Sequence, residues 1–292
     1  MSKNALRIAC VQITAGRDVA ANIARAETLV REAVARRADL VSLPENVALI
    51  EPNPERALAQ ARTEDDHPAL PAFRALAREA KTWIHVGSLN IRTADGRIAN
   101  RAFVIDSGGD IVARYDKLHL FDVALGRGES YRESDTVVPG TAAVLAPTPW
   151  GPLGLSICYD VRFPHLYRAL AQAGARLIAI PAAFTRTTGQ AHWHVLVRAR
   201  AIETGCYVFA AAQCGTHAEG RRTYGHSLIV DPWGTVLADG GEAEGVIVAE
   251  IDPAMVDTIR RRIPALTHDR LFAAPAGLSA IAGGRDTAKA SS

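Results

Sequence analysis

The stretch Gly154-Leu-Ser-Ile-Cys158-Tyr-Asp160-Val-Arg162-Phe-Pro164 places a thiol where an apolar segment ends and a helix is predicted to begin. Before the cysteine, branched apolar residues alternate with small ones, a pattern typical of a buried strand. Pro164 suits the first turn of a helix, and Gly174 would end that helix. Backbone N–H groups at such a junction would favour a thiolate and could stabilise an oxyanion. We therefore predict that Cys158 is reactive.

Outward from this stretch, strand-like and helix-like segments alternate, which indicates an α/β fold. Strands are predicted at 6–13, 39–43, 83–89, 153–157, 176–181, 206–213 and 225–231, a hairpin at 103–115, and helices at 22–37, 70–81, 164–174 and 190–204. Ser107-Gly-Gly109 supplies the hairpin turn, and Gly205 is placed to cap the last of these helices. The segment between 44 and 70 is predicted to be a proline-rich loop.

Length and composition are those of an ordinary globular protein. The chain has 292 residues, of which 48% are hydrophobic and 22% charged. This length would allow two domains, but no linker or charge block divides the chain. We expect one domain over 1–275 and a flexible tail over 276–292, where the sequence becomes small and polar.

Charge and cysteine usage exclude several classes of protein. The net charge is +2, and the basic run Arg260-Arg-Arg262 lacks the surrounding basic field that nucleic-acid binding requires. No apolar run approaches the ~18 residues that span a bilayer, and the N-terminus does not resemble a signal peptide. The four cysteines show neither zinc-site spacing nor the density of a disulfide scaffold, which favours a cytoplasmic location. They are Cys10, Cys158, Cys206 and Cys214.

A cysteine nucleophile needs a base for its proton and a donor for the charge on the attacked atom. Glu45 follows a predicted strand, Lys117 follows the hairpin, and Glu133 lies in a later loop. Strand ends meet readily at the carboxyl edge of a sheet in α/β folds. We therefore expect these three side chains to converge on Cys158. Taken singly, each would be an ordinary loop, surface or core residue.

At these residues the sequence resembles the nitrilase superfamily of carbon-nitrogen hydrolases. Its glutamate, lysine and cysteine motifs are matched in order by Pro44-Glu45-Asn46, Tyr115-Asp-Lys117-Leu-His-Leu-Phe-Asp122 and Cys158-Tyr-Asp-Val-Arg-Phe-Pro164. Glu133 falls where the family commonly has a supporting glutamate. The resemblance extends from the first strand to about Arg270. It implies a single-domain, four-layer α-β-β-α sandwich, a homodimer or higher homo-oligomer, a small amide substrate, and neither a metal nor an organic cofactor.

Four further stretches resemble the Nit branch of this superfamily. They are Thr188-Gly-Gln-Ala-His-Trp193, Arg198-Ala-Arg-Ala-Ile-Glu-Thr204, Ala210-Ala-Ala-Gln-Cys-Gly215 and Tyr224-Gly-His-Ser-Leu-Ile-Val-Asp-Pro-Trp-Gly234. The branch contains deaminated-glutathione amidases and omega-amidases, and two of the stretches are closer to the first. Gln190 and His194 depart from its usual proline and glutamate. The alternatives are an omega-amidase of 2-oxo-acid amides, a nitrilase, an N-carbamoyl amino-acid hydrolase and a non-catalytic scaffold.

The resemblance implies a catalytic role for each residue of the set. Glu45 would take the proton of Cys158 as the sulfur attacks a primary amide, leaving a thioester that water hydrolyses to the acid after ammonia departs. The Lys117 ammonium and the backbone N–H of Tyr159 would stabilise the oxyanion. Glu133 would hold Lys117, which two neighbouring carboxylates should keep charged at neutral pH.

Further residues are expected to bind the substrate. Arg162 could bind a substrate carboxylate through two parallel hydrogen bonds, as guanidinium favours. Phe184 and Thr188, on the loop after the strand 176–181, are candidates for the pocket wall, and His192 for its mouth. His192 and His194 point to different faces of a helix, so no metal site is expected from them.

Overall fold

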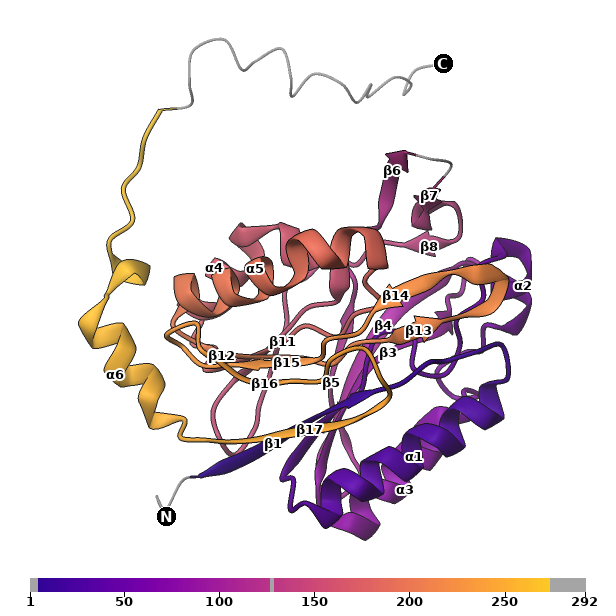
Figure 1. The fold of residues 1–292 in the computed structure, drawn as a ribbon, viewed down its shortest axis with the longest axis horizontal. Helices are drawn as coiled ribbons and strands as arrows, with labels where there is room; N and C mark the ends of the chain where they lie inside the picture. Colours follow the sequence, from indigo (N-terminus) through magenta and orange to yellow (C-terminus); the bar gives the residue numbers. More distant parts are fainter. Residues whose placement is uncertain (1–4, 127–128, 274–292) are drawn as a thin grey trace.

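The structure, a computed structural model, describes residues 5–126 and 129–273 of the chain. The tail expected at 276–292 lies outside the described residues. Six α-helices are present in the described ranges, and Figure 1 labels them. They are α1 (Val19–Ala35), α2 (Pro54–Gln60), α3 (Ala69–Ala80), α4 (Pro164–Gln172), α5 (Arg186–Thr204) and α6 (Ala254–Arg262).

The first of two large sheets is built mainly from the N-terminal half of the chain. Its strand order is β17-β1-β2-β3-β4-β5, and β8 pairs with β4. The strands are β1 (Leu6–Gln12), β2 (Leu40–Ser42), β3 (Trp83–Arg92), β4 (Ile98–Ile105), β5 (Ile111–Asp116), β8 (Val137–Val138) and β17 (Gly245–Ile251). Because β1, β2 and β3 are parallel, their carboxyl ends share one edge.

The second large sheet repeats the strand-helix-strand design with the C-terminal half. Its order is β16-β15-β12-β11-β10-β9, and β10, β11 and β12 are parallel. The strands are β9 (Leu145–Ala146), β10 (Leu153–Leu155), β11 (Leu177–Ala179), β12 (Tyr207–Ala210), β15 (Leu228–Val230) and β16 (Val236–Asp239). Two small hairpins are formed by β6 (Asp122–Gly126) with β7 (Glu129–Arg132), and by β13 (Cys214–Thr216) with β14 (Arg222–Tyr224).

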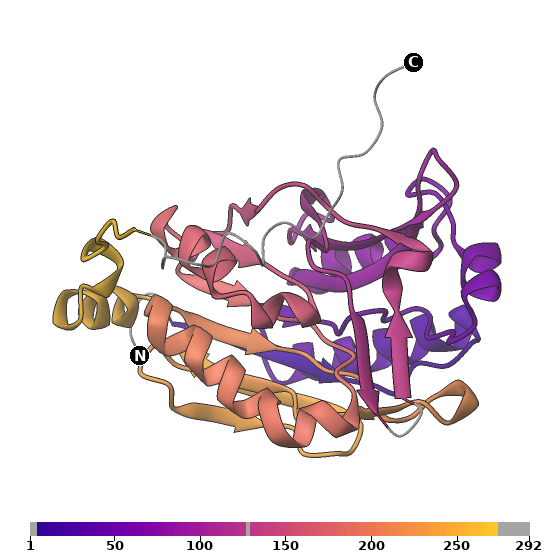
Figure 2. The same ribbon diagram turned by 90° about the horizontal axis from the view of Figure 1, so that it is seen from above.

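The two sheets pack face to face between pairs of helices, which makes four layers (Figures 1 and 2). Helices α1 and α3 cover the outer face of the first sheet, and α4 and α5 cover that of the second. Alternation along β1 shows the arrangement: Leu6, Ile8 and Cys10 face the core shared with the second sheet, whereas Ala9 and Val11 face α1 and α3. The expected α-β-β-α sandwich is confirmed.

Local structure departs from the sequence-based expectation in several places. The expected loop at 44–70 contains α2, whose N-cap Asn53 accepts a hydrogen bond from the Arg56 N–H. Helix α5 begins at Arg186 rather than at 190, because Thr185 caps it there. Thr188 therefore lies in its first turn and not in a loop. The strand expected at 225–231 is only β15, since Gly225 and His226 adopt left-handed backbone conformations.

Other local expectations are confirmed. Pro164 begins α4, and Gly205 caps α5 in a left-handed conformation. Cys10, Cys206 and Cys214 are buried and free of disulfides, as expected for structural thiols. Within the two described ranges, no helix combines the length and apolar character that crossing a bilayer would take.

Candidate active site

Glu45, Lys117 and Cys158 each follow the end of a strand, namely β2, β5 and β10. Because the two sheets stack with these ends at one place, residues far apart in sequence surround one cavity. Its volume is about 380 Å³, and the three residues line it together with Glu133. The structure thus brings together the four residues that the sequence predicted to converge.

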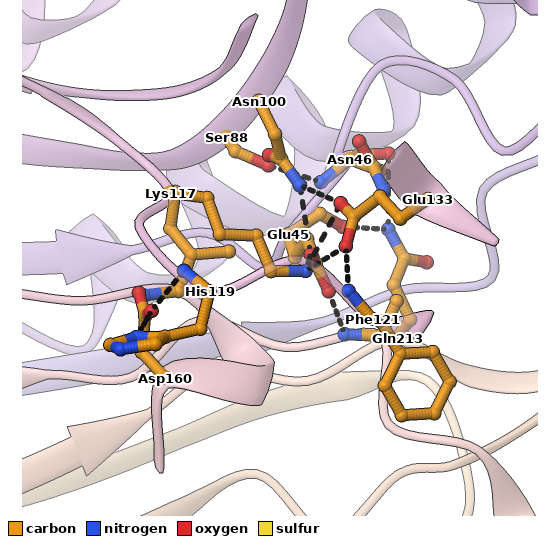
Figure 3. Close-up of polar contacts among 12 residues, drawn as sticks. Glu45, Asn46, Ser88, Asn100, Lys117, His119, Phe121, Glu133, Asp160 and Gln213 are labelled. Carbon is orange, nitrogen blue, oxygen red and sulfur yellow. Dashed lines mark hydrogen bonds and ion pairs between the residues drawn. The ribbon is translucent and has the colours of Figure 1, made fainter. Parts of the chain in front are cut away.

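The charged groups of this cavity form a compact network (Figure 3). The Lys117 ammonium lies 2.8 Å from Oε1 of Glu45, and 3.1 and 2.9 Å from the two oxygens of Glu133. Its side chain is only 2% exposed. A buried ammonium between two carboxylates is held in one position by charge-assisted hydrogen bonds. This geometry suits a group that must stabilise charge at a fixed point.

Backbone and amide groups hold the two carboxylates in place. The Ala183 N–H donates to Oε2 of Glu45 over 2.8 Å. Asn100, in β4, donates from Nδ2 to Glu45 over 3.0 Å and to Glu133 over 3.1 Å (Figure 3). The Phe121 N–H donates to Glu133 over 2.7 Å. Sequence reasoning missed Asn100. The signal that could have found it is a polar amide inside a largely apolar strand, because a buried amide needs hydrogen-bond partners.

Asp160 joins the lysine segment to the cysteine segment. Its carboxylate accepts hydrogen bonds from the Ile157 N–H at 2.8 Å, the Tyr115 hydroxyl at 2.6 Å and the His119 N–H at 3.0 Å. The His119 ring lies 2.7 Å from the same carboxylate. Because Lys117 sits between Tyr115 and His119 in the chain, this buried carboxylate fixes its backbone relative to Cys158. Asp160 was quoted in the cysteine motif but was given no role.

The electrostatic surroundings set the ionisation of Glu45 and Lys117. Burial alone would raise the pKa of Glu45, but the Lys117 ammonium, with hydrogen bonds from neighbouring groups, lowers that pKa below its ordinary value. Burial would likewise lower the pKa of Lys117, yet Glu133 and Glu45 raise it well above the ordinary value. At neutral pH the glutamate is therefore an anion, able to accept a proton, and the lysine is a cation.

The backbone N–H groups that were expected to favour a thiolate do not decide the ionisation of Cys158. Burial and the nearby Glu45 carboxylate raise the pKa of this thiol well above its ordinary value, outweighing Lys117, which lowers it. Cys158 as a whole residue is only 7% exposed. The resting pair is thus a neutral thiol beside a carboxylate base, so the proton must leave the sulfur during attack on the substrate.

The backbone at Cys158 turns sharply. Its φ of 50° lies in the left-handed region, which is uncommon for residues other than glycine. Its N–H donates to the Pro181 carbonyl over 2.8 Å, and a 3₁₀ turn, Cys158–Arg162, leads on to α4. Strain of this kind is often found at functional positions and needs such bonds to persist.

The residues expected to bind substrate separate into two groups. Tyr159, Phe184 and Thr188 line the cavity with the charged network. Arg162 and His192 are not among the residues that line it. Their side chains lie 3.3 Å apart, and the Arg162 guanidinium also lies over the Phe184 ring. Arg162 therefore lies against Phe184, a residue of the cavity wall, without being among the lining residues itself.

His192 and His194 do not form a pair, but His194 has two other neighbours of metal-ligand type. His226, distant in sequence, and Asp239 place ligand-type atoms within 4.8 Å of those of His194. The Asp239 carboxylate lies 3.0 Å from the His194 ring and 2.9 Å from the His226 ring. This group lies apart from the residues that line the cavity. Asp239 thus accepts or shares a hydrogen bond with one ring nitrogen of each histidine.

The fold and the site together define an enzyme of hydrolytic type: a four-layer sandwich with glutamate, lysine and cysteine around one cavity. Comparison with known proteins agrees. A family model described as carbon-nitrogen hydrolase matches residues 7–261. The chain is similar to the deaminated glutathione amidase of Yersinia enterocolitica, with 41% identity covering 92% of this chain and 94% of the relative. The same-named protein of Synechocystis is 44% identical, covering 90% and 97%.

A solved structure resembles the whole described fold. Saccharomyces cerevisiae Nit3, described as a member of branch 10 of the nitrilase superfamily, superposes with a TM-score of 0.83 at 29% identity. The match covers 92% of this chain and 97% of that one. The chain belongs to the carbon-nitrogen hydrolase family, within the nitrilase superfamily. It is a hydrolase that acts on amide carbon–nitrogen bonds.

Proposed function

We propose that this protein hydrolyses deaminated glutathione through a thioester on Cys158. The observation that carries the proposal is the placement of the Lys117 ammonium 2.8 Å from Glu45 in the cavity that Cys158 also lines. A carboxylate, a thiol and an ammonium that line one cavity support attack on a carbonyl. The substrate itself is inferred from the two relatives named deaminated glutathione amidases.

In the first half-reaction, the Glu45 carboxylate takes the thiol proton while the sulfur bonds to the amide carbon. The carbonyl oxygen becomes an oxyanion, which Lys117 and the backbone N–H of Tyr159 stabilise. Glu45 then gives its proton to the nitrogen, and the carbon–nitrogen bond breaks. A primary amide releases ammonia. In glutathione each amide nitrogen belongs to the following residue, so deaminated glutathione releases an amine. Cys158 keeps the acyl group as a thioester.

In the second half-reaction, water replaces the amine. Glu45 removes a proton from the water, whose oxygen bonds to the thioester carbon. The carbon–sulfur bond breaks, the carboxylic acid leaves, and the sulfur recovers its proton from Glu45. Glu133 keeps the Lys117 ammonium in position throughout, because both of its oxygens lie within hydrogen-bond distance. These steps use only the named side chains, the backbone N–H of Tyr159 and water.

Intact mass spectrometry tests the proposal. The protein is mixed with deaminated glutathione or 2-oxoglutaramate, quenched within milliseconds, and weighed. We expect a mass increase equal to the acyl group, located on Cys158 by peptide mapping, and turnover of the substrate. Cys158→Ala should show neither while unfolding at the same temperature as the wild type. Turnover by Cys158→Ala would refute the role of this thiol. Turnover of 2-oxoglutaramate alone would identify an omega-amidase instead.

We further propose that the protein is a cytoplasmic homodimer. Four unpaired, buried cysteines suit a reducing compartment. Val195 and Ile202 lie seven residues apart on one face of α5 and are 68% and 54% exposed. Trp233, after β15, is 55% exposed. Large apolar side chains at such positions favour burial against a second copy of the chain.

A further inference from the structure

Two histidines and an aspartate from three segments of the chain meet beside α5. His194 lies in α5, His226 lies between β14 and β15, and Asp239 is the last residue of β16. Helix α5 packs against β14 and β15, which brings these distant residues together (Figure 1). Imidazole nitrogens and carboxylate oxygens are common ligands of Zn²⁺ in proteins. The cluster therefore has the composition of a zinc site.

The donor atoms of this cluster are close enough to share one ion. Nε2 of His194 lies 3.0 Å from Oδ2 of Asp239, and Nδ1 of His226 lies 2.9 Å from Oδ1 of the same carboxylate. One ligand atom from each of the three residues lies within 4.8 Å of the other two. Ligands bound tetrahedrally at about 2.1 Å from Zn²⁺ are roughly 3.4 Å apart. Small rotations of the histidine side chains would therefore place all three residues on one ion.

Contacts around the cluster hold its residues in position. The His226 carbonyl accepts a hydrogen bond from Nε1 of Trp193 over 2.7 Å, and the His226 N–H donates to the Gly241 carbonyl over 2.6 Å. The Tyr224 ring stacks on the His226 ring with 4.4 Å between centroids. The Gly241 N–H donates to Oδ1 of Asp239 over 2.9 Å. Outer contacts of this kind orient metal ligands before the ion arrives.

The cluster is also accessible from solvent. The side chains of His194, His226 and Asp239 are each partly exposed, so a hydrated ion can reach them without unfolding of the chain. The carboxylate supplies one negative charge toward the cation. Three protein ligands leave one position of a tetrahedron for a water molecule. Such an open position is typical of zinc sites that are not purely structural.

We propose that His194, His226 and Asp239 bind one Zn²⁺ ion, with the fourth coordination position open to water. The ion ties α5 to the segment before β15 and to the end of β16, the edge strand of the second sheet. None of the three residues lines the cavity that contains Cys158. The inference therefore goes beyond the proposed amidase function and does not depend on it.

Isothermal titration calorimetry of chelator-treated, tag-free protein with Zn²⁺ tests the site. We expect one ion per chain in the wild type, and no competition from Mg²⁺, which prefers oxygen ligands. In His194→Gln and Asp239→Asn, Kd should rise by roughly 10²-fold or more, because loss of an outer contact alone costs about 10–100-fold. Both substitutions keep a side chain that forms hydrogen bonds, and circular dichroism establishes that the variants are folded.

Two control variants and two further measurements locate the ion. His192→Ala removes an exposed histidine of the same helix that is not in the cluster, so its Zn²⁺ affinity should match that of the wild type. Cys158→Ala should also bind normally, because the cluster contains no thiol. The Co²⁺-loaded protein should show the visible absorption of a tetrahedral ion without a thiolate charge-transfer band. Zn²⁺ should raise the Tm of the wild type but not that of Asp239→Asn.

Several outcomes would overturn the proposal. If the wild type shows no saturable Zn²⁺ binding, the three side chains form only a hydrogen-bonded cluster. If His194→Gln and Asp239→Asn bind as tightly as His192→Ala, the ion lies elsewhere. Loss of binding in Cys158→Ala would assign the ion to the catalytic thiol. Amide turnover is measured separately, and its absence in a protein that binds Zn²⁺ as expected would refute the proposed function alone.

Discussion

Single residues set the protonation state from which the reaction starts. Glu45 is ionised because Lys117 lies against it, Lys117 is charged because two carboxylates surround it, and Cys158 is a neutral thiol because it is buried beside an anion. Because each protonation state depends on the neighbouring group, a substitution of that neighbour changes it.

The pH dependence of activity follows from these directions. The pKa of Glu45 lies below 4.5 and that of Lys117 well above 10.5, so neither changes charge in the neutral range. We expect wild-type kcat/KM to be flat between about pH 6 and 9. Glu133→Gln removes one of the two anions beside Lys117, which lowers the pKa of the lysine. The alkaline fall in the activity of this variant should therefore begin at a lower pH than in the wild type. A histidine-like inflection near pH 6.5 in the wild type would contradict this assignment.

Lys117→Met tests the oxyanion donor. The substitution leaves Glu45 and Glu133 buried without a cation, so the pKa of each carboxyl should rise, and the developing negative charge loses its donor. We expect kcat to fall by roughly 10²–10³-fold or more. Stopped-flow acylation of Cys158 measures the step directly, and circular dichroism establishes that the variant is folded. Lys117→Gln, which keeps a polar donor, serves as the second variant; wild-type acylation in both would exclude the role.

At the scale of secondary-structure elements, the site depends on how closely strand ends approach one another. Gly87 in β3 lies beneath the segments that follow β2 and β11. A Cβ there would be 2.0 Å from the Leu43 carbonyl oxygen, 2.5 Å from that of Pro44 and 2.6 Å from Pro181. Those segments carry Glu45 and the Ala183 N–H that binds it. Only a glycine lets them lie this close.

Gly87→Ala should therefore separate the two segments. We expect a stability loss of about 1–3 kcal/mol, as overpacked cores show, and a larger loss in kcat because Glu45 moves away from Cys158. Chemical denaturation and steady-state kinetics measure the two effects. Gly16→Ala is the matched control, since an added Cβ there meets nothing within 4 Å and the backbone φ is ordinary. A Gly87→Ala protein with normal kcat would show that the approach of these segments is not needed.

At the scale of the whole molecule, the exposed apolar face of α5 governs the proposed assembly. Val195→Asp with Ile202→Asp places charges on this face without touching the buried side of the helix, where Trp193 and Val197 pack. We expect dimers to become monomers in light scattering coupled to size-exclusion chromatography. The exposed Glu32→Asp change on α1 gives a control that should remain dimeric. Persistence of the dimer in the double variant would place the interface elsewhere.

The sequence determined the alternating strand and helix order, the α/β class and the four residues that meet in the cavity. These follow from local signals: apolar periodicity, glycine and proline positions, and the three motifs at strand ends. Boundaries were less predictable, because capping by Thr185 starts α5 earlier than apolar spacing alone indicates, and α2, capped by Asn53, was missed altogether.

Only the tertiary structure decided what each side chain meets. Asn100 reaches both carboxylates because β4 lies beside the strands that carry them, and Asp160 joins two segments that are distant in the chain. The thiol at Cys158 is neutral because burial and a neighbouring anion outweigh the helix start that its sequence suggested. The sequence specifies which groups are present. The distances between them and their burial, which set the electrostatic energies, are fixed only when the two sheets stack.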